Sequence, residues 1–386
     1  MGRKQRLKRK LHEIFTSAGL KSLFGRTPGF SFDLPVDEHT RKLRVHRFTL
    51  TKDQFEKAKA TIESGLKIYI DEIREDRIGG TIDIIYSKHP MPTEVRIENL
   101  LDIGENRICV GVTRSKTILS SFNEVPHILV AGQTSGGKST FLRQIITSLY
   151  LNNPGSEFTL IDLKGGLEFQ LFENLERIEV MPSIDDAIKK LVVLFETLEE
   201  RMKLIKANSA KDIQEFFKIP DEQRKYPDEA SKKIGLNRHF LVIDEAAEMF
   251  LAGHHANAKD IQFARRVLTK IALQGRAIGV HVVIATQRPD SRALDSQVKA
   301  NLTGVLATQT PNDATSISIL GNGRATDLPR IAGRAIWKTG SEMLEVQTPF
   351  LSPDEVIELL KPYRKSSTWH RRFQLFLAKS VYSLGV

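Results

Sequence analysis

Residues 132–139 constrain this chain more than any other segment. They read Gly-Gln-Thr-Ser-Gly-Gly-Lys-Ser, a complete G-x-x-x-x-G-K-[ST] phosphate-loop motif. An apolar run at residues 127–131 precedes the motif, and an amphipathic segment at 139–150 follows it. This order predicts a strand, a loop whose backbone N–H groups surround a phosphate, and a helix whose N-terminus favours negative charge. The motif therefore predicts a nucleotide-binding α/β fold.

The loop chemistry indicates ATP and Mg²⁺ as ligands. Lys138 is expected to reach the β- and γ-phosphates, and the hydroxyl of Ser139 is expected to contact Mg²⁺. The residues predicted to bind nucleotide are Gly132, Gln133, Thr134, Ser135, Gly136, Gly137, Lys138, Ser139 and Thr140.

A pair of acids follows a second apolar run, at residues 240–243. A phosphate loop needs an acidic magnesium partner at the end of a neighbouring strand, and Asp244 is in that place. Glu245 follows directly and is placed to polarise an attacking water, as a hydrolysing enzyme requires. The two residues are therefore predicted to hold metal and to activate water.

Two further polar residues are candidates for the same site. Gln287 ends the apolar run at 280–286, where its side chain could bind the γ-phosphate and report its loss. Arg276 lies near the end of the helix expected at 258–277, where a subunit edge could present it to the nucleotide of the next protomer. The alternative, that Arg276 is an ordinary surface residue at a helix end, stays open at this point.

Composition narrows the class of protein. The chain has 386 residues, a formal net charge of +10 and one cysteine, Cys109, so no intrachain disulfide can form and a reducing, cytoplasmic setting is expected. The sequence contains no run of 18 apolar residues, so it predicts no membrane-spanning helix. The positive charge favours a polyanionic partner, either nucleic acid or an anionic membrane surface. The basic, amphipathic first residues are a candidate for peripheral membrane attachment, for DNA contact or for a solvated arm.

The patterns divide the chain into four parts. A basic arm is expected at 1–40 and a small α+β accessory domain at 41–125. A phosphate-loop ATPase domain with a parallel sheet is expected at 126–350, because apolar strands alternate there with amphipathic helices. A helix starting at Ser352 and a basic tail with aromatic residues are expected at 351–386.

Four segments together resemble the FtsK/SpoIIIE family of ring-shaped DNA translocases, within the HerA/FtsK group. They are the lead-in and phosphate loop at 126–139, Leu-Ile-Asp-Leu-Lys at 160–164, Leu-Val-Ile-Asp-Glu-Ala-Ala-Glu at 241–248, and the stretch from Gly275 to Pro289 that ends in Ala-Thr-Gln-Arg-Pro. The resemblance covers roughly residues 104–350.

The resemblance implies a RecA-like motor that forms a hexamer, threads double-stranded DNA and hydrolyses ATP between subunits. In that family Arg276 would match the arginine supplied in trans. Arg288 and Lys299 would match basic residues of a pore loop that grips the DNA backbone. Asn312 and Ser316 stand where a second pore loop would carry basic residues, which is a departure. The segments at 328–337 and 345–350 resemble the FtsK-like coupling proteins of conjugative elements in Gram-positive bacteria, and so imply a membrane-associated transfer machinery as a partner.

Two other functions remain alternatives. FtsK-like modules also drive protein secretion of the type VII kind, although such proteins usually join several ATPase modules. A nucleotide-dependent adaptor that moves nothing is the third reading, but Glu245 argues against it because a pure switch needs no carboxylate to activate water.

Overall fold

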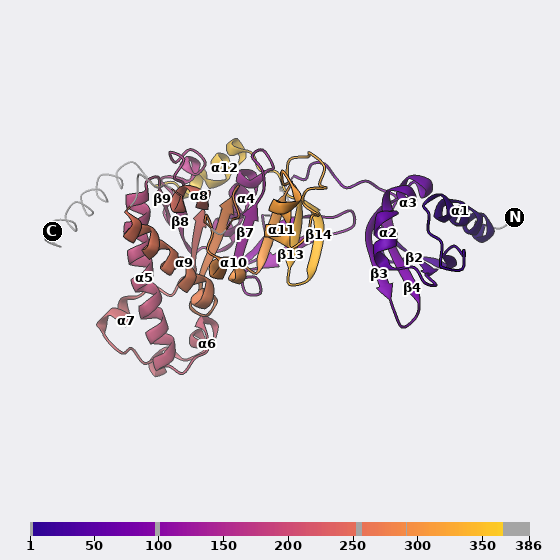
Figure 1. Cartoon of the computed structure of the whole chain (residues 1–386). Coiled ribbons are helices and arrows are strands. Elements are labelled where there is room, and N and C mark those ends of the chain that lie inside the picture. Colours follow the sequence, from indigo (N-terminus) through magenta and orange to yellow (C-terminus); the bar gives the residue numbers. More distant parts are fainter. Residues whose placement is uncertain (1–2, 97–100, 252–256, 291, 366–386) are drawn as a thin grey trace. The chain divides into compact units, whose positions relative to one another are not determined.

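A computed structural model of the chain describes residues 3–96, 101–251, 257–290 and 292–365 (Figure 1). The chain divides into two compact units, one formed by residues 1–92 and 112–117 and the other by 93–111 and 118–386. Each unit is described by itself. Among the described residues, no helix has the length and apolar character needed to cross a bilayer.

The first unit is a four-stranded antiparallel sheet with helices that share its core, in the strand order β1-β2-β4-β3. It has apolar side chains at alternate strand positions, such as Leu43 and Val45 in β2 and Ile82 and Ile84 in β4, and these are buried. Its elements are α1 (Arg3–Ser17), β1 (Gly29–Pro35), β2 (Thr40–His46), α2 (Lys52–Lys57), α3 (Lys59–Leu66), β3 (Tyr69–Asp76) and β4 (Thr81–Ser87).

The structure divides the chain differently from the sequence expectation. Residues 1–40 are not a separate arm, because Leu11, Ile14 and Phe15 of α1 are buried in the same core as the sheet. The boundary expected near residue 126 also differs. Strands β5 (Arg107–Val112) and β6 (Thr117–Ser121) extend the large sheet of the second unit, so this sheet takes strands from before the expected boundary.

The second unit contains a ten-stranded, mostly parallel sheet in the order β6-β5-β14-β13-β12-β7-β11-β10-β8-β9. Strands β12, β7, β11, β10, β8 and β9 pair in parallel, and β12, β13 and β14 pair antiparallel. The predicted α/β class is therefore confirmed. These strands are β7 (His127–Ala131), β8 (Glu157–Ile161), β9 (Ile178–Met181), β10 (His239–Ile243), β11 (Val280–Thr286), β12 (Gly304–Thr308), β13 (Arg334–Thr339) and β14 (Glu342–Gln347).

The central strands are buried on both faces, which explains why their sequences are continuous apolar runs rather than alternating ones. Their register places the carboxyl ends of β7, β10 and β11 at one edge of the sheet, with Thr286 paired to Ala131 and Ile243 paired to Ile284. Loops that follow parallel strands meet at that edge. The phosphate loop, the two acids and Gln287 all follow strands there.

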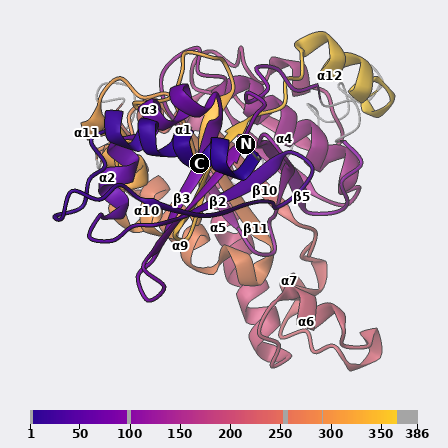
Figure 2. The same cartoon turned by 90° about the vertical axis from the view of Figure 1, so that its right-hand side faces the viewer.

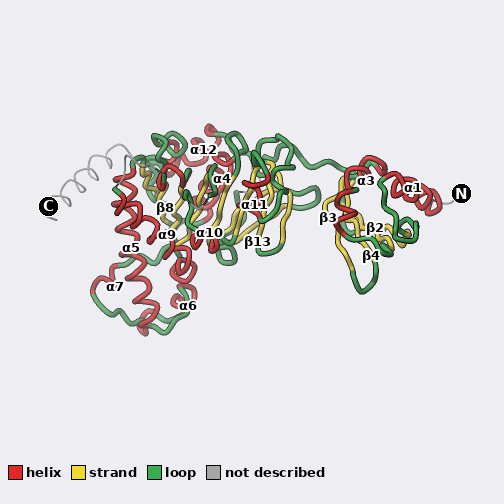
Figure 3. The backbone as a smooth tube through the Cα atoms, viewed as in Figure 1, coloured by secondary structure: helices red, strands yellow, loops and turns green. Residues whose placement is uncertain are grey.

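Helices cover the two faces of this sheet (Figures 1 and 3). One core contains residues of α5 and α9, and the other contains residues of α4 and α12. The helices of this unit are α4 (Lys138–Asn152), α5 (Ile184–Ala207), α6 (Ile213–Phe217), α7 (Glu229–Lys233), α8 (Ala246–Phe250), α9 (Ala258–Ile278), α10 (Ser296–Asn301), α11 (Asp313–Leu320) and α12 (Pro353–Leu360). Single 3₁₀ turns lie at Gln170–Phe172, Asp221–Gln223 and Lys361–Tyr363.

Local sequence signals set the ends of these helices. The Ser183 hydroxyl accepts a bond from the Asp186 N–H at the start of α5, and Ser352 with Glu355 forms a capping box at the start of α12. Helix α9 ends at Gly279, which has a positive φ of 71° and donates its N–H to the Gly275 carbonyl.

Residues 208–238 leave the sheet pattern, as their polar composition predicts. They hold the short helices α6 and α7, which project from the end of α5 (Figures 1 and 2). Of the basic residues expected in the tail, Lys361, Arg364 and Lys365 are described, and Arg371 and Arg372 lie outside the described residues.

Candidate active site

The phosphate loop folds through conformations that glycine favours. Gly132 has a φ of 142° and Gly137 a φ of 96°, both in the region that side chains rarely adopt. A Cβ on Gly132 would lie 2.0 Å from the Thr308 hydroxyl, and one on Gly137 would lie 2.7 Å from the Gly333 nitrogen. Both glycines are therefore required by backbone angle and by space.

Backbone bonds from distant segments hold the loop in place. The Gln133 N–H donates to the Gln309 carbonyl at 3.0 Å, and the Gly333 N–H donates to the Gly136 carbonyl at 3.1 Å. These bonds connect the loop to the segments that follow β12 and precede β13. The loop is thus braced from the antiparallel side of the sheet.

Lys138 points back into its own loop. Its ammonium donates to the carbonyls of Gly132 at 2.8 Å and Gln133 at 2.7 Å. Burial lowers the pKa of Lys138 to about 8, while the charges of Glu245 and Asp244 oppose that shift. Ser139 and Thr140 follow at the start of α4 and are half-buried. The lysine lies where a phosphate held by the loop could take over its hydrogen bonds.

Asp244 is buried at the end of β10, with 6% of its surface exposed. Burial raises the pKa of its carboxyl to about 6, and the nearby Lys164 acts in the opposite direction. The Lys164 ammonium lies 3.5 Å from an Asp244 oxygen and 3.7 Å from a Glu245 oxygen. Both acids therefore share one cation that comes from the loop after β8.

The fit to Mg²⁺ rests on the donor set and its electrostatics. The Ser139 hydroxyl and the Asp244 carboxylate are hard oxygen ligands, and Mg²⁺ takes few protein ligands when substrate phosphates and water complete its shell. The ion pair with Lys164 shows that a cation is favourable beside Asp244. The residues present therefore fit a magnesium ion.

Glu245 is fixed by donors from the neighbouring strand. Its Oε1 accepts from the Thr286 hydroxyl at 2.6 Å, and the Gln287 N–H lies 3.1 Å from Oε1 and 3.0 Å from Oε2. The Ala247 N–H also donates to Oε1, at 3.4 Å. These bonds orient the carboxylate. Oε2 is also the Glu245 oxygen that lies 3.7 Å from the Lys164 ammonium.

Gln287 is linked to the phosphate loop through its side chain. The Thr134 hydroxyl donates to Gln287 Oε1 at 2.8 Å. The backbone of Gln287 contacts Glu245 and its side chain contacts Thr134, so this residue touches both the water-activating candidate and the phosphate loop. The structure thus brings Lys138, Asp244, Glu245 and Gln287 together.

The structure does not bring Arg276 to this site. It is exposed in the last turn of α9, which enters β11 at the amino end of that strand, the edge opposite the phosphate loop. Arg276 therefore cannot serve the nucleotide of its own subunit through a short contact, which leaves the predicted role in trans as an expectation.

The two predicted DNA-binding residues differ in their surroundings. Arg288 is exposed directly after Gln287. Lys299 is partly buried, and its ammonium donates to the Pro289 carbonyl at 3.2 Å and to Ser318 at 3.0 Å. Burial also lowers the pKa of Lys299. Asn312 caps α11, and Ser316 is buried, so both have local structural roles.

Sequence reasoning missed two residues of the site. Lys164 binds both acids, and Thr286 holds Glu245. Lys164 follows β8, which pairs in parallel with β10, so its position after a strand end was the available signal. Thr286 ends β11 and carried no comparable signal, because a threonine within a strand usually reflects β propensity.

Comparisons with known proteins fit this geometry. Residues 102–291 match the model of the FtsK/SpoIIIE family. The chain is 28% identical over 284 residues to the DNA translocase FtsK of Staphylococcus aureus, a match covering 72% of this chain and 34% of that protein. The chain thus spans about a third of the length of the curated relatives it matches.

Two solved structures share the fold. The pCW3 conjugation coupling protein TcpA, in a monomer form with ATPγS, has a TM-score of 0.65 and 23% identity, over 92% of this chain and 99% of that one. The cytoplasmic domain of the Thermomonospora curvata type VII secretion ATPase EccC has a TM-score of 0.54 and 21% identity, over 70% of this chain and 32% of that one.

Proposed function

Because residues 102–291 of this chain are an FtsK/SpoIIIE family domain, we propose that the protein is an ATP-hydrolysing motor that moves double-stranded DNA. The observation that carries the proposal is the contact set around Glu245. This carboxylate is buried beside the phosphate loop and is bonded to the residue that also contacts Thr134. A protein that only binds nucleotide does not need a fixed carboxylate there.

Each residue of the site has a separate proposed role in ATP hydrolysis. The loop N–H groups and Lys138 hold the phosphates of ATP, with Ser139 and Asp244 as the ligands of Mg²⁺. The ion supplies positive charge to the phosphate oxygens when bound. Glu245, oriented by Thr286 and Gln287, accepts a proton from the attacking water at Oε2. Lys164 must move away from that oxygen for the water to reach it.

Gln287 provides a connection from the phosphates to the DNA-binding candidates. Its side chain contacts the phosphate loop, and Arg288 is its immediate neighbour. Pro289 follows, and its carbonyl is bound by Lys299. A shift of Gln287 on loss of the γ-phosphate would therefore displace a short segment that bears Arg288. Arginine and lysine contacts to phosphate give grip without sequence preference, as a motor requires.

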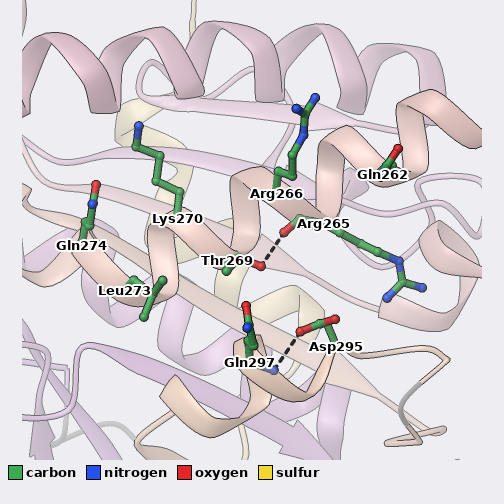
Figure 4. A pocket seen from close by; sticks show the side chains of 9 residues that line it. All are labelled: Gln262, Arg265, Arg266, Thr269, Lys270, Leu273, Gln274, Asp295 and Gln297. Carbon is green, nitrogen blue, oxygen red and sulfur yellow. Dashed lines mark hydrogen bonds between the residues drawn. The ribbon is translucent and has the colours of Figure 1, made fainter.

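The exposed face of α9 supports assembly into a ring of subunits, proposed here as a hexamer. An open pocket lies between α9 and α10 (Figure 4). Arg266, Thr269 and Leu273 line it and recur at helical spacing, and Arg276 continues the same stripe. Leu273 is 62% exposed and offers an apolar contact on this stripe. A neighbouring subunit on this stripe would receive Arg276.

The biological setting we propose is conjugative or mobile-element DNA transfer at a membrane-associated machinery. It is supported by the fold shared with a conjugation coupling protein along nearly the whole chain, including the first unit. Type VII protein secretion is the alternative, supported by the fold shared with EccC over a smaller part of the chain.

A DNA-stimulated ATPase assay tests the proposal. We expect duplex DNA to raise ATP turnover of the wild type, and Lys138→Ala and Glu245→Gln to abolish the stimulation. Lys203→Ala, an exposed lysine on α5, is the matched control and should behave as wild type. Electron microscopy with ATPγS and duplex DNA should show six-membered rings with density in the pore. Turnover that is indifferent to DNA would overturn the proposal, and stimulation by an export-signal peptide instead would favour secretion.

A further inference from the structure

One end of the first unit exposes a group of large apolar side chains that no core residue covers. Leu23 is 88% exposed, Phe24 82%, Phe48 45% and Ile78 103%. They come from three separate loops: the turn at 21–26, the segment after β2, and the β3–β4 hairpin. Single exposed apolar residues are ordinary, but four from three adjacent loops form a patch, and such patches mark interaction sites.

Backbone contacts show that these loops are neighbours. The Leu23 N–H donates to the Thr49 hydroxyl at 3.0 Å, next to Phe48. The Arg47 N–H donates to the Gly80 carbonyl at 3.0 Å, which ties the same segment to the hairpin of Ile78. The three loops therefore form one surface at the end of β1 and β2 where Gly29 pairs with His46. We name this surface the apolar edge.

Local hydrogen bonds define the backbone of the apolar edge. The turn at 21–26 is closed by a bond from the Ser22 N–H to the Arg26 carbonyl at 2.8 Å, and the Arg26 N–H donates to the Ser22 hydroxyl at 3.1 Å. Phe48 has a φ of 53°, a conformation that is uncommon for a bulky residue. Such outliers persist where the surroundings enforce them. These backbone features hold the loops in conformations that expose the apolar side chains to solvent.

Positive charge surrounds the apolar edge. Lys21 and Arg26 flank Leu23 and Phe24 in the sequence, and both are exposed. Arg77 beside Ile78 is exposed and lies 3.3 Å from Glu75, which also faces Arg47 at 3.5 Å. The Asp76 carboxylate accepts from the Gly79 N–H at 2.8 Å. The acids near the patch are therefore bound to local donors, and Lys21 and Arg26 have no acidic partner among the described residues.

Helix α1 extends this charge. It carries six Lys and Arg residues and one acid, Glu13, which pairs with Arg9. The His12 ring accepts or donates a 2.8 Å bond with Thr27, so one flank of α1 adjoins the turn. Lys4 and Lys8 lie on that flank, at i−8 and i−4 from His12, and are exposed. The basic flank of α1 therefore adjoins the turn that carries Leu23 and Phe24.

We propose that the apolar edge and the basic flank of α1 dock this protein on an anionic lipid bilayer. Leu23, Phe24, Phe48 and Ile78 would enter the headgroup and acyl boundary, while Lys4, Lys8, Lys21 and Arg26 face the anionic headgroups. Apolar side chains ringed by basic ones are the composition that binds such interfaces. DNA accounts for the basic residues alone, since a phosphate backbone offers nothing to leucine or isoleucine side chains.

Vesicle sedimentation of the full chain tests this docking. Phosphatidylglycerol–phosphatidylcholine vesicles should bind the wild type at least about tenfold more tightly than phosphatidylcholine vesicles, with binding falling as salt rises. Leu23→Ser with Phe24→Ser should lower the affinity at least about tenfold. Lys4→Gln with Lys8→Gln should lower it and flatten the salt dependence.

The matched control is Leu34→Ser with Val36→Ser. Both residues are about half exposed, at 52% and 56%, and lie at the opposite end of β1. This control should bind vesicles as the wild type does, and all variants should keep the ATP turnover of the wild type. The proposal is overturned if the wild type ignores anionic vesicles, or if the control loses as much affinity as the apolar-edge variant. Two other results would also overturn it. In one, Lys4→Gln with Lys8→Gln loses affinity only for a 30-base-pair DNA duplex and not for vesicles. In the other, Leu23→Ser with Phe24→Ser changes only self-association.

Discussion

The Thr134 hydroxyl in the phosphate loop donates a 2.8 Å hydrogen bond to Gln287 Oε1 at the end of β11. Thr134 and Gln287 follow β7 and β11, which are neighbouring parallel strands, so the bond spans the edge where nucleotide phosphates are expected. The same glutamine donates its backbone N–H to Glu245. Gln287 therefore connects the phosphate loop to Glu245, the residue proposed to activate water, and to its neighbour Arg288.

Gln287→Ala should separate nucleotide binding from hydrolysis. The variant loses the contact to Thr134 but keeps the backbone bond to Glu245, so we expect ATP affinity within about threefold of wild type and turnover reduced by about 10²-fold. Thr134→Val should reduce turnover less, and the double variant should be no slower than Gln287→Ala. Additive losses in this cycle would show that the two side chains act separately.

Lys164→Met should destabilise the metal-free protein. Two buried carboxylates would lose their shared cation, although the 37% exposure of the lysine side chain screens the effect, so a loss of about 1 kcal/mol is expected. Urea unfolding in EDTA measures this loss. Adding Mg²⁺ with ATPγS should remove the difference in stability between the variant and the wild type. Lys164→Arg keeps the charge and serves as control. An unchanged midpoint for Lys164→Met would contradict the pairing.

Arg276→Ala should bind ATP normally yet lose turnover by about 10³-fold or more, because an arginine supplied in trans stabilises transition-state charge. Mixing Arg276→Ala with Lys138→Ala subunits provides the sharper measurement. Each defect would then fall on a different interface in some rings, so the mixture should be more active than either variant alone. No gain on mixing would leave Arg276 as a surface residue.

His127 should make the protein less stable in mild acid. Burial lowers its pKa to about 4, and an unfolded chain titrates near the ordinary value of about 6.5. Between those values the unfolded state binds more protons, so the free energy of unfolding falls as pH drops through this window, by up to about 3 kcal/mol. His127→Asn, which can still accept from the Val282 N–H, should flatten the slope measured by urea unfolding. The same change at exposed His89 should leave the slope intact.

Gly132→Ala should cost far more stability than Gly321→Ala. Both glycines have positive φ, 142° and 84°, but only a Cβ at 132 meets other atoms, whereas position 321 is open. We expect about 1 kcal/mol at 321 from backbone angle alone and at least twice that at 132, together with loss of ATP binding. Thermal unfolding and nucleotide titration give both numbers. Equal costs would mean that the loop yields to the added methyl group.

The sequence predicted the strands whose environment is uniform. His127–Ala131 and Val280–Thr286 are buried on both faces, so their apolar runs have one interpretation. Arg334–Thr339 and Glu342–Gln347 are interior strands of the sheet that the sequence does not predict, because Lys338 and Glu345 interrupt their apolar runs and their partners are set by tertiary pairing.

The sequence predicts those site residues that directly follow an apolar strand. Lys138, Asp244, Glu245 and Gln287 follow strand ends, and parallel pairing brings such ends together. Lys164 depended on which strand pairs beside β10, which only the sheet order gives. The sequence also predicts a basic arm where the structure has α1, because the core that buries Leu11 and Phe15 is formed by segments distant in the chain.

The bond between Gly333 and Gly136 also orders events during synthesis of the chain. The ribosome delivers β7 and the phosphate loop early, but the N–H that braces Gly136 belongs to a residue made much later. Closing so long a segment is entropically costly until β12 and β13 pair. A nascent chain thus carries an unfinished loop until most of the sheet has emerged. We therefore expect the phosphate loop to reach its final conformation only after the segment that contains Gly333 has been synthesised.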